Sequence, residues 1–424
     1  MNAIVYPSKI CGELPAISSK SAAHRLLIAS AFSEKATLIR CETINEDILA
    51  TAECLRTLGA EISYNNKVFS VVPKYKNNSG TLFCNESGTT LRLLLPIASA
   101  IGGEWIFDMR GRLPERPLSP LKEELIAHGI SFENIGKNML KISGKLEYGN
   151  YSISGRVSSQ FISGLLFALT LLDGESTLTI TDEIESLPYI NMTLDTLRAF
   201  GANIIQNENI FKIHGKKSVC PNNIFVEGDW SNSAFPLCAA AISKSTVTLT
   251  DITTKTHQGD SKILDILKMF GAIVTTTDNT VTVAGNTLCG IEINAKDIPD
   301  LVPIIAVVAA VAKGTTKISG AARLRIKESD RLQTTYEMLT TLGADVTLRE
   351  DGFVINGKPE LLGGSINSYN DHRIAMSACV ASLVCKDKVI IKDSGAVKKS
   401  YPHFFEDMKK LGFNIQITCE GGKN

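Results

Sequence analysis

A five-residue phrase that ends in glycine recurs six times along the 424-residue chain. Each copy begins with leucine or methionine, and the copies end at Gly59, Gly129, Gly201, Gly271, Gly343 and Gly412. Successive glycines are 70, 72, 70, 72 and 69 residues apart. Glycine readily takes the left-handed conformation that ends a helix. The regular spacing therefore predicts six units of about 70 residues, each with a helix that ends at its glycine.

Each unit also contains an apolar helix rich in alanine and leucine. These helices are expected to begin near Ser21, Gly88, Ser159, Ser231, Asp300 and His372. Stretches such as residues 67–72, 177–181, 246–250 and 389–391 predict strands between the helices. Three such units make a domain of ordinary size, so we expect an α/β protein with two domains of three units each.

The expected boundary between the domains lies near the middle of the chain. Residues 223–228 precede the fourth apolar helix and offer a place where the chain can cross between domains. The strand expected at residues 3–7 precedes the first complete unit, so we assign it to the C-terminal half. The expected domains are therefore residues 14–226, and residues 1–13 together with 227–424.

Polar and cationic residues gather where helices are expected to begin. The second set of helices is expected to start near Arg116, Ser186, Asp260, Lys327 and Lys399. Serine, threonine, asparagine and aspartate cap free N–H groups, and capping alone is the simpler interpretation of any single site. Capping does not explain cations, because lysine and arginine oppose the dipole at a helix start. The cations in question are Lys20, Arg116, Lys327, Arg331, Arg373 and Lys399.

An anion held jointly by N–H groups, helix dipole and cation would explain both features. Six repeated units offer many such helix ends, which is more positive potential than one phosphate group needs. The pattern therefore indicates two polyanionic small-molecule ligands. We expect the equivalent helix ends of the two domains to face one cleft that holds both.

Composition limits the other classes of function. Lysine plus arginine and aspartate plus glutamate both number 44, so the net charge is 44 − 44 = 0, and aromatic residues make up only 6%. A nucleic-acid-binding protein would more often be basic, with interleaved aromatic side chains. No H-x-x-x-H spacing and no complete G-x-x-x-x-G-K-[ST] nucleotide loop appears in the sequence. We expect neither a metal nor a cofactor.

The cysteines and apolar stretches bear on location. Ten cysteines are scattered without a C-x-x-C pair, and several, such as Cys238 and Cys379, lie in apolar runs typical of reduced core residues. The first ten residues do not resemble a secretory signal. The longest apolar run, residues 304–312, is far shorter than the roughly 20 residues that span a bilayer. We expect a cytoplasmic monomer that does not associate with membranes.

At these polar positions the chain closely resembles the 5-enolpyruvylshikimate-3-phosphate synthase family. The resemblance runs in order over all six units and depends on short matching pieces. These are residues 19–25 (SKSAAHR), 87–92 (SGTTLR), 115–117 (ERP), 158–161 (SSQF), 299–300 (PD), 325–331 (RIKESDR), 371–376 (DHRIAM) and 399–402 (KSYP). The resemblance implies a two-domain inside-out α/β barrel of six β-α-β-α-β-β repeats, three per domain.

The resemblance also implies the reaction and its residues. The enolpyruvyl group of phosphoenolpyruvate moves to the 5-hydroxyl of shikimate 3-phosphate, and phosphate is released. The residues implied to bind shikimate 3-phosphate are Lys20, Ser21, Arg25, Ser158, Ser159, Gln160, Ser186, Tyr189, Asp300 and Lys327. Those implied to bind phosphoenolpyruvate are Lys20, Gly88, Arg116, Gln160, Arg331, Arg373 and Lys399. Asp300 is the expected base, while Lys20 and Glu328 are the candidates for proton exchange at the methylene carbon.

Three positions depart from the family pattern. Glu86, Arg323 and His24 stand where asparagine is usual, so the sequence does not predict the response to the inhibitor glyphosate. A carboxylate at Glu86 would either pair with a cation of the site or repel the ligand.

Two alternatives share the fold. UDP-N-acetylglucosamine enolpyruvyl transferase carries a cysteine in a mobile loop, and the comparable residues 110–120 contain none. A non-catalytic protein that binds phosphate ligands would be expected to lack Asp300, Lys20 or Glu328, and all three are present.

Overall fold

The computed structural model describes residues 1–74, 77–215, 221 and 223–418. The chain forms two compact units. The continuous unit is Ser18–Val226, and the split unit combines Met1–Ile17 with Glu227–Asn424. Each unit has its own cluster of buried apolar side chains.

One sheet of the continuous unit shows the repeated pattern directly. Its strands are β6 (Ser79–Asn85), β7 (Gly103–Met109), β8 (Ser131–Asn134) and β9 (Met139–Gly144), and they lie in the order β6-β7-β9-β8. The first two strands are parallel, and the remaining pairs are antiparallel. Helix α3 (Gly88–Ile101) connects β6 to β7, and α4 (Leu121–Ala127) connects β7 to β8. The unit of sequence is therefore β-α-β-α-β-β.

The other two sheets of the continuous unit follow the same order. They are β14-β3-β5-β4 and β10-β11-β13-β12. The strands are β3 (Thr37–Arg40), β4 (Glu61–Asn65), β5 (Val68–Val72), β10 (Asn150–Ile153), β11 (Glu175–Ile180), β12 (Asn203–Asn207), β13 (Ile210–His214) and β14 (Asn223–Phe225). The remaining α-helices are α1 (Lys20–Ala31), α2 (Glu46–Leu58), α5 (Ser159–Thr170) and α6 (Leu187–Ala199), and a 3-10 turn, η1, spans Leu113–Glu115.

The split unit repeats this arrangement in the sheets β2-β15-β17-β16, β18-β19-β21-β20 and β22-β23-β1-β24. The strands are β1 (Asn2–Tyr6), β2 (Gly12–Pro15), β15 (Thr246–Thr250), β16 (Ile273–Thr276), β17 (Thr280–Ala284), β18 (Glu292–Asn294), β19 (Thr315–Ser319), β20 (Asp345–Arg349), β21 (Gly352–Asn356), β22 (Gly364–Asn367), β23 (Val389–Lys392) and β24 (Asn414–Thr418). The α-helices are α7 (Trp230–Ser243), α8 (Ile263–Phe270), α9 (Val302–Ala309), α10 (Arg331–Thr341), α11 (His372–Ala381) and α12 (Phe404–Lys410). The 3-10 turns are η2 (Gly259–Lys262), η3 (Pro299–Leu301), η4 (Ala322–Ile326), η5 (Ser382–Val384) and η6 (Ser394–Lys399).

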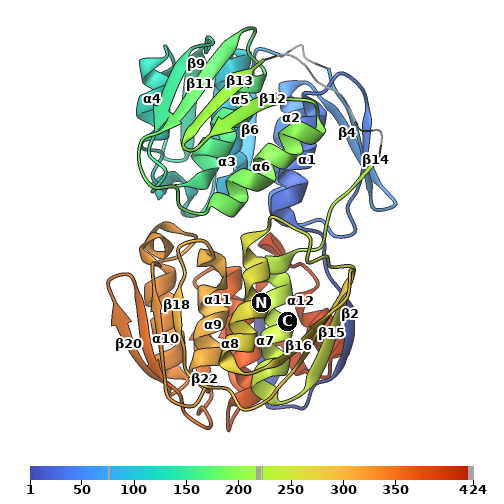
Figure 1. The fold of residues 1–424 in the computed structure, drawn as a ribbon, viewed down its shortest axis with the longest axis vertical. Coiled ribbons are helices and arrows are strands. Elements are labelled where there is room, and N and C mark those ends of the chain that lie inside the picture. Colours follow the sequence, from blue (N-terminus) through green and yellow to red (C-terminus); the bar gives the residue numbers. More distant parts are fainter. Residues whose placement is uncertain (75–76, 216–220, 222, 419–424) are drawn as a thin grey trace, which may run out of the picture. The chain divides into compact units, whose positions relative to one another are not determined.

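Three strands, β1, β2 and β14, pair with strands that are distant from them in sequence. Strand β2 leads into α1 of the continuous unit but pairs in parallel with β15 of the split unit (Figure 1). Conversely, β14 leads into α7 but pairs with β3. Strand β1 lies between β23 and β24. The chain passes between units at Ile17 and again after Val226. The first crossing falls four residues after the expected start at residue 14, because β2 as a whole belongs to a sheet of the split unit.

The six glycines of the sequence phrase behave as their spacing predicts. All six have positive φ, between 80° at Gly201 and 118° at Gly59. Gly59 and Gly271 are the C-caps of α2 and α8, and their N–H groups bond back to carbonyls of the last helical turn. The prediction that each glycine ends a helix is confirmed.

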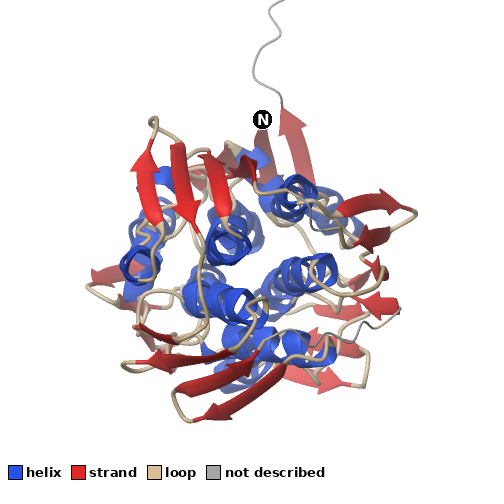
Figure 2. Cartoon of the chain, turned by 90° about the horizontal axis from the view of Figure 1, so that it is seen from above, coloured by secondary structure: helices blue, strands red, loops and turns tan. Residues whose placement is uncertain are grey.

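The apolar helices occupy the interior of their units. All eight residues of α9, VPIIAVVA, are buried, and a helix that is apolar on every side needs such a position. In the split unit, α7, α9 and α11 contact one another, and the helices gather inside the strands (Figure 2). No helix within the described residues is both long and apolar enough to cross a membrane.

The expected helix starts hold for the apolar set but not for all of the second set. Arg116 does not begin a helix, because it precedes Pro117 and is extended, and α4 starts only at Leu121. Lys399 lies at the end of η6, and α12 starts five residues later. These two cations are held by loops and not by the first turn of an α-helix.

Candidate active site

In the continuous unit, the start of α1 places a lysine beside a carboxylate. Ser19 is the N-cap, and its hydroxyl accepts a hydrogen bond from the N–H of Ala22. Lys20 is the first helical residue, and its Nζ lies 2.8 Å from Oδ2 of Asp47 in the first turn of α2. The helix dipole opposes a cation at this end, and Asp47 offsets that repulsion. The sequence predicted Lys20 but not its partner.

Arg25, on the same helix, is buried and bonded to neutral groups. Its Nε donates to Oγ1 of Thr193 at 2.8 Å, Nη1 to the carbonyl of Ser21 at 2.8 Å, and Nη2 to the carbonyl of Tyr189 at 2.9 Å. Burial lowers the pKa of Arg25 to about 10. Arg25, Ser21 and Tyr189, all predicted to bind shikimate 3-phosphate, therefore meet at one place in this unit.

His24 lies in a buried chain of hydroxyl groups. Its Nδ1 is 2.7 Å from Oγ1 of Thr51, which is 2.7 Å from Oγ1 of Thr90, which donates to Oγ of Ser87. Burial, together with the charges of Lys20 and Arg25, holds the pKa of His24 well below its ordinary value. The histidine is thus neutral and links α1, α2 and α3.

The starts of α3 and α5 meet around Gln160. Its Oε1 accepts from Nη1 of Arg92 at 3.1 Å, and its Nε2 donates to Oγ1 of Thr89 at 2.8 Å. The hydroxyl of Ser158 caps α5 by accepting from the N–H of Gln160 at 3.3 Å. Ser159 is the first residue of that helix and is buried. The capping interpretation of Ser158 therefore holds, alongside any role in ligand binding.

Gly88 explains how Arg116 approaches the same helix start. A Cβ added at Gly88 would lie 2.6 Å from Nη1 of Arg116, so only glycine leaves room for the guanidinium there. Glu86 lies against the same loop, because a Cβ at Gly111 would lie 2.6 Å from the Glu86 carboxyl carbon. Ser186 precedes α6 in the left-handed conformation, and its side chain makes no capping bond.

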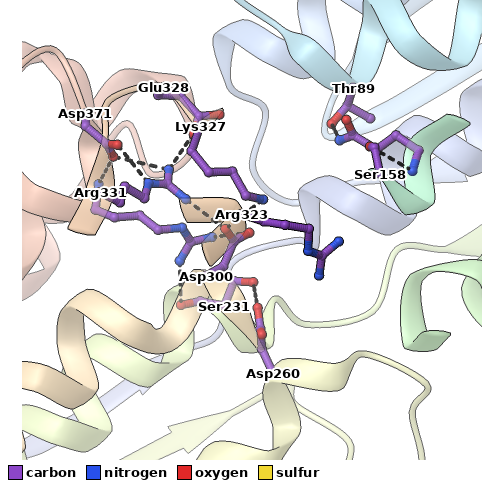
Figure 3. A network of polar contacts seen from close by, with 12 residues as sticks. Thr89, Ser158, Ser231, Asp260, Asp300, Arg323, Lys327, Glu328, Arg331 and Asp371 are labelled. Atoms are coloured by element: carbon purple, nitrogen blue, oxygen red, sulfur yellow. Dashed lines mark hydrogen bonds and ion pairs between the residues drawn. The ribbon is translucent and has the colours of Figure 1, made fainter. Parts of the chain in front are cut away.

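In the split unit, Asp300 is surrounded by cations (Figure 3). Its Oδ1 lies 2.8 Å from Nη1 of Arg331 and 3.5 Å from Nζ of Lys327, and its Oδ2 lies 3.3 Å from Nη2 of Arg373. Burial by itself raises the pKa of Asp300. The charges of Arg373, Lys327 and Arg331 outweigh burial and hold that pKa well below its ordinary value.

Arg331 is the centre of this cluster. Besides Asp300, it contacts Oε2 of Glu328 through Nη2 at 2.7 Å and Oδ2 of Asp371 through Nε at 2.8 Å. Burial lowers the pKa of Arg331, but the three carboxylates raise it well above its ordinary value. For Lys327 burial dominates and lowers the pKa, although Asp300 opposes that effect.

Asp371 organises the helix start that carries Arg373. Its carboxylate caps α11 by accepting from the N–H of Arg373 at 2.9 Å, and it also accepts from Oγ of Ser329 at 2.9 Å. Nearby, Nζ of Lys399 donates to the carbonyl of Asn370 at 2.7 Å. Arg323 points its Nη2 at the carbonyl of Lys296, at 2.9 Å.

The structure thus brings the predicted residues together in two groups. Lys20, Ser21, Arg25, Gly88, Arg116, Ser158, Ser159, Gln160, Ser186 and Tyr189 belong to the continuous unit. Asp300, Lys327, Glu328, Arg331, Arg373 and Lys399 belong to the split unit. Sequence reasoning missed Asp47 as the partner of Lys20 and Asp371 as the partner of Arg331. The available signal was their position in the first turn or at the N-cap of a helix beside a predicted cation.

Two units of three β-α-β-α-β-β repeats, with apolar helices inside and sheets outside, define the two-domain inside-out α/β class of protein. A model of the EPSP synthase (3-phosphoshikimate 1-carboxyvinyltransferase) family matches residues 4–408. The chain belongs to this family.

Relatives agree with that assignment over almost the whole chain. The 3-phosphoshikimate 1-carboxyvinyltransferase of Clostridium novyi is 40% identical over 425 residues, covering 97% of each chain. That of Clostridium perfringens strain 13 is 41% identical over 415 residues, covering 96% of this chain and 98% of the relative.

Solved structures agree as well. The EPSP synthase of Acinetobacter baumannii has a TM-score of 0.82 and 28% identity, covering 99% of this chain and 100% of that chain. The enolpyruvyl transferase NikO of Streptomyces tendae has a TM-score of 0.77 at 18% identity, covering 98% of both chains, and shows the same fold.

Proposed function

We propose that this protein transfers the enolpyruvyl group of phosphoenolpyruvate to the 5-hydroxyl of shikimate 3-phosphate and releases phosphate. Family membership over residues 4–408 supports this reaction for the chain. The observation that carries the chemistry is a partly buried carboxylate, Asp300, that contacts Lys327, Arg331 and Arg373. Such a group is a base held among cations that can bind the phosphate and carboxylate groups of the substrates.

The reaction needs a base at the hydroxyl and an acid at the methylene carbon. We assign the base to Asp300, which takes the 5-hydroxyl proton while the oxygen bonds to C2 of phosphoenolpyruvate. The methylene carbon gains a proton and becomes a methyl group, which gives a tetrahedral intermediate. Loss of a methyl proton and departure of phosphate from C2 then restore the double bond in the product.

Ligand binding increases the strength of this base. In the protein alone, three cations stabilise the ionised form of Asp300, which makes it a weak proton acceptor. Phosphate and carboxylate groups that bind Lys327, Arg331 and Arg373 offset their charge. The proton affinity of Asp300 then rises when the substrates are in place.

Of the two candidates for the acid, the contacts favour Lys20. The carboxylate of Glu328 lies 2.7 Å from Nη2 of Arg331, and this pair favours the form without a proton. The ammonium group of Lys20 already carries the proton that the methylene carbon needs. Because Lys20 and Asp300 belong to different units, the proposal requires both units to contribute to one active site.

We propose that the phosphate of shikimate 3-phosphate binds at Ser158, Ser159, Ser186 and Lys327, with Ser21 and Arg25 at its carboxylate and Gln160 and Tyr189 along its ring. Phosphoenolpyruvate would bind Lys20, Gly88, Arg116, Gln160, Arg331, Arg373 and Lys399. Arginine suits its carboxylate because the guanidinium donates two parallel hydrogen bonds. We also propose that the protein is a cytoplasmic monomer. The buried free thiols of Cys238 and Cys379 are typical of a reducing compartment and support the location.

The test is phosphate release from phosphoenolpyruvate, with shikimate 3-phosphate or UDP-N-acetylglucosamine as acceptor. We expect release only with shikimate 3-phosphate. Asp300→Asn should lose a factor of about 10²–10⁴ in kcat while it still binds shikimate 3-phosphate. Release with UDP-N-acetylglucosamine alone would identify the sister reaction instead. Binding without turnover in the unmodified protein would indicate a non-catalytic function.

A further inference from the structure

Asp260, in the split unit, is connected to Asp300 through Ser231 and Arg373. It sits in η2, is 1% exposed, and its Oδ2 accepts a hydrogen bond from the hydroxyl of Ser231. The carbonyl of Ser231 accepts from Nη1 of Arg373 at 3.5 Å, and Nη2 of Arg373 lies 3.3 Å from Oδ2 of Asp300. Figure 3 shows Asp260, Ser231 and Asp300 close together in this network. A continuous set of polar contacts therefore joins the two carboxyl groups.

The backbone around Asp260 is fixed by its neighbour Gln258. The Gln258 side chain donates to the carbonyl of Gly228 at 2.7 Å and accepts from the N–H of Trp230 at 3.1 Å. These bonds hold η2 against the start of α7. The position of Asp260 relative to Ser231 is thus set by two independent attachments.

The charged groups near Asp260 come from three elements. Burial and the charge of Asp300 raise the pKa of Asp260 to about 6, although Arg373 and the Ser231 hydroxyl oppose this, and Asp229 at the N-cap of α7 adds to the rise. On its own segment, His257 is exposed, and Lys262 points to Asp297 at 3.5 Å. At neutral pH the protein therefore holds a second carboxylate, the fully buried Asp260, near Asp300.

We propose that Asp260 is a positioning residue for the transfer reaction: it fixes Arg373 through Ser231, and its negative charge strengthens Asp300 as a proton acceptor. The proposal rests on the assigned role of Asp300 as the base. Its physical reason is that a nearby negative charge disfavours the ionised form of a carboxyl group and so increases its proton affinity. Asp260 partly offsets the three cations that weaken Asp300.

Asp260→Asn tests the charge, because an asparagine oxygen can still accept from Ser231. The readout is the ratio of kcat/KM between variant and wild type at each pH from 5 to 8. This ratio removes the titration of the substrate phosphates, which also occurs near pH 6. We expect a ratio near one at about pH 5, falling by roughly 3- to 10-fold above pH 6.5, where wild-type Asp260 is ionised. Asp265→Asn, an exposed acid of the neighbouring helix α8, is the matched control and should stay near one throughout.

Ser231→Ala tests the hydrogen bond and has a different signature. The Ser231 hydroxyl stabilises the ionised form of Asp260, so its removal raises the pKa of Asp260. The ratio should then dip between about pH 6 and 7 and rise again at higher pH, where Asp260 is ionised in both proteins. It should level off below one, because the hydrogen bond through which Asp260 fixes Arg373 is missing at every pH.

Thermal unfolding separates these effects from damage to the fold. The folded-state pKa of Asp260 lies above the ordinary value of about 3.9. Its contribution to stability is therefore full below that value and is lost as the pH rises through about 6. Asp260→Asn should for this reason have a Tm at pH 7.5 no lower than wild type.

A ratio that is flat across the pH range, whether at one or at a uniformly lower value, would overturn the inference, because a merely structural role would not follow the titration of Asp260. Asp300→Asn in the same assay separates this outcome from failure of the proposed function. Near-wild-type turnover of Asp300→Asn would show that Asp300 is not the base. An inactive Asp300→Asn together with a flat Asp260→Asn ratio would keep Asp300 as the base and contradict only the proposed role of Asp260.

Discussion

The two units hold Arg331 and Arg25, two buried arginines, in different ways. In the split unit, Arg331 contacts three carboxylates and Asp300 contacts three cations, so positive and negative charges are closely paired. In the continuous unit, the buried Arg25 donates to a hydroxyl and two carbonyls. Acids neutralise Arg331, whereas neutral dipoles bind Arg25.

This difference affects what each unit can do with an anion. Dipoles orient a guanidinium without cancelling its charge, so Arg25 keeps an attraction for a carboxylate or phosphate group. Around Asp300 an incoming anion must share cations that already have partners. We infer that Arg25 mainly supplies binding, and that around Asp300 binding is coupled to the strength of the base.

The largest expected effect is a loss of kcat caused by a substitution in the continuous unit that leaves this unit folded. Lys20→Ala should lower kcat by about 10²–10⁴-fold, because it removes the proposed acid. The hydrogen-bonded partner Asp47 is left behind, so the free energy of unfolding should fall by roughly 1–2 kcal/mol. Turnover and urea unfolding measure the two quantities, and Lys67→Ala, an exposed lysine paired with Glu42, is the control. Turnover close to that of wild type would remove Lys20 from the mechanism.

The next effect concerns the stability of the paired cluster. Asp371→Ala should lower the free energy of unfolding by about 3–5 kcal/mol, because it leaves the buried charge of Arg331 without its main partner. Asp330→Ala is the matched control, since Asp330 also caps a helix but pairs with the partly exposed Arg325. The control should lose only about 1 kcal/mol. Equal losses in urea unfolding would show that capping, and not the buried arginine, accounts for the effect.

A smaller loss is expected where the partner of the arginine is neutral. Thr193→Val removes the hydroxyl that accepts from Nε of Arg25 and should cost about 1–3 kcal/mol. Thr196→Val on the same helix removes a hydroxyl bonded only to the backbone of Met192 and should cost less. If Thr193→Val costs as much as Asp371→Ala, the contrast between the two units is wrong.

The smallest effect concerns Glu86. A carboxylate near Gly88 and Arg116 opposes an incoming anion, so Glu86→Asn should tighten phosphoenolpyruvate or glyphosate binding by a few-fold, up to about tenfold. Calorimetric titration in the presence of shikimate 3-phosphate measures this. Glu104→Gln, an exposed acid of the same unit, is the control. Unchanged or weaker binding of both ligands would contradict the expected repulsion.

The repeat architecture was predictable because its signals are local. A glycine such as Gly343 ends a helix through its own conformational freedom, and a serine such as Ser87 begins one through its own hydroxyl. These effects depend only on residues that are close in sequence, so they can be recognised without knowledge of the fold. They predicted the six units and the starts of the apolar helices.

The polar partners were harder to predict because they are distant in sequence. Asp47 is 27 residues from Lys20, and Asp371 is 40 from Arg331. No periodicity marks such a pair, since it forms only when two helices pack together, α1 with α2 and α10 with α11. The same reason explains Arg116 and Lys399, whose loops are positioned by contacts to Gly88 and Asn370 and not by a helix of their own.

The position of β1 bears on the order in which the chain can fold during synthesis. Ala3 pairs with Ile391 and with Ile417, so β1 stays unpaired during synthesis until β23 and β24 have been made. The continuous unit needs nothing beyond Val226 and can form while this strand is still unpaired. Loop closure over almost 400 residues is entropically costly and delays the split unit. Because Asn2 also lies opposite Thr418, a circular permutant that moves residues 1–6 behind the last strand would keep every sheet and remove that delay.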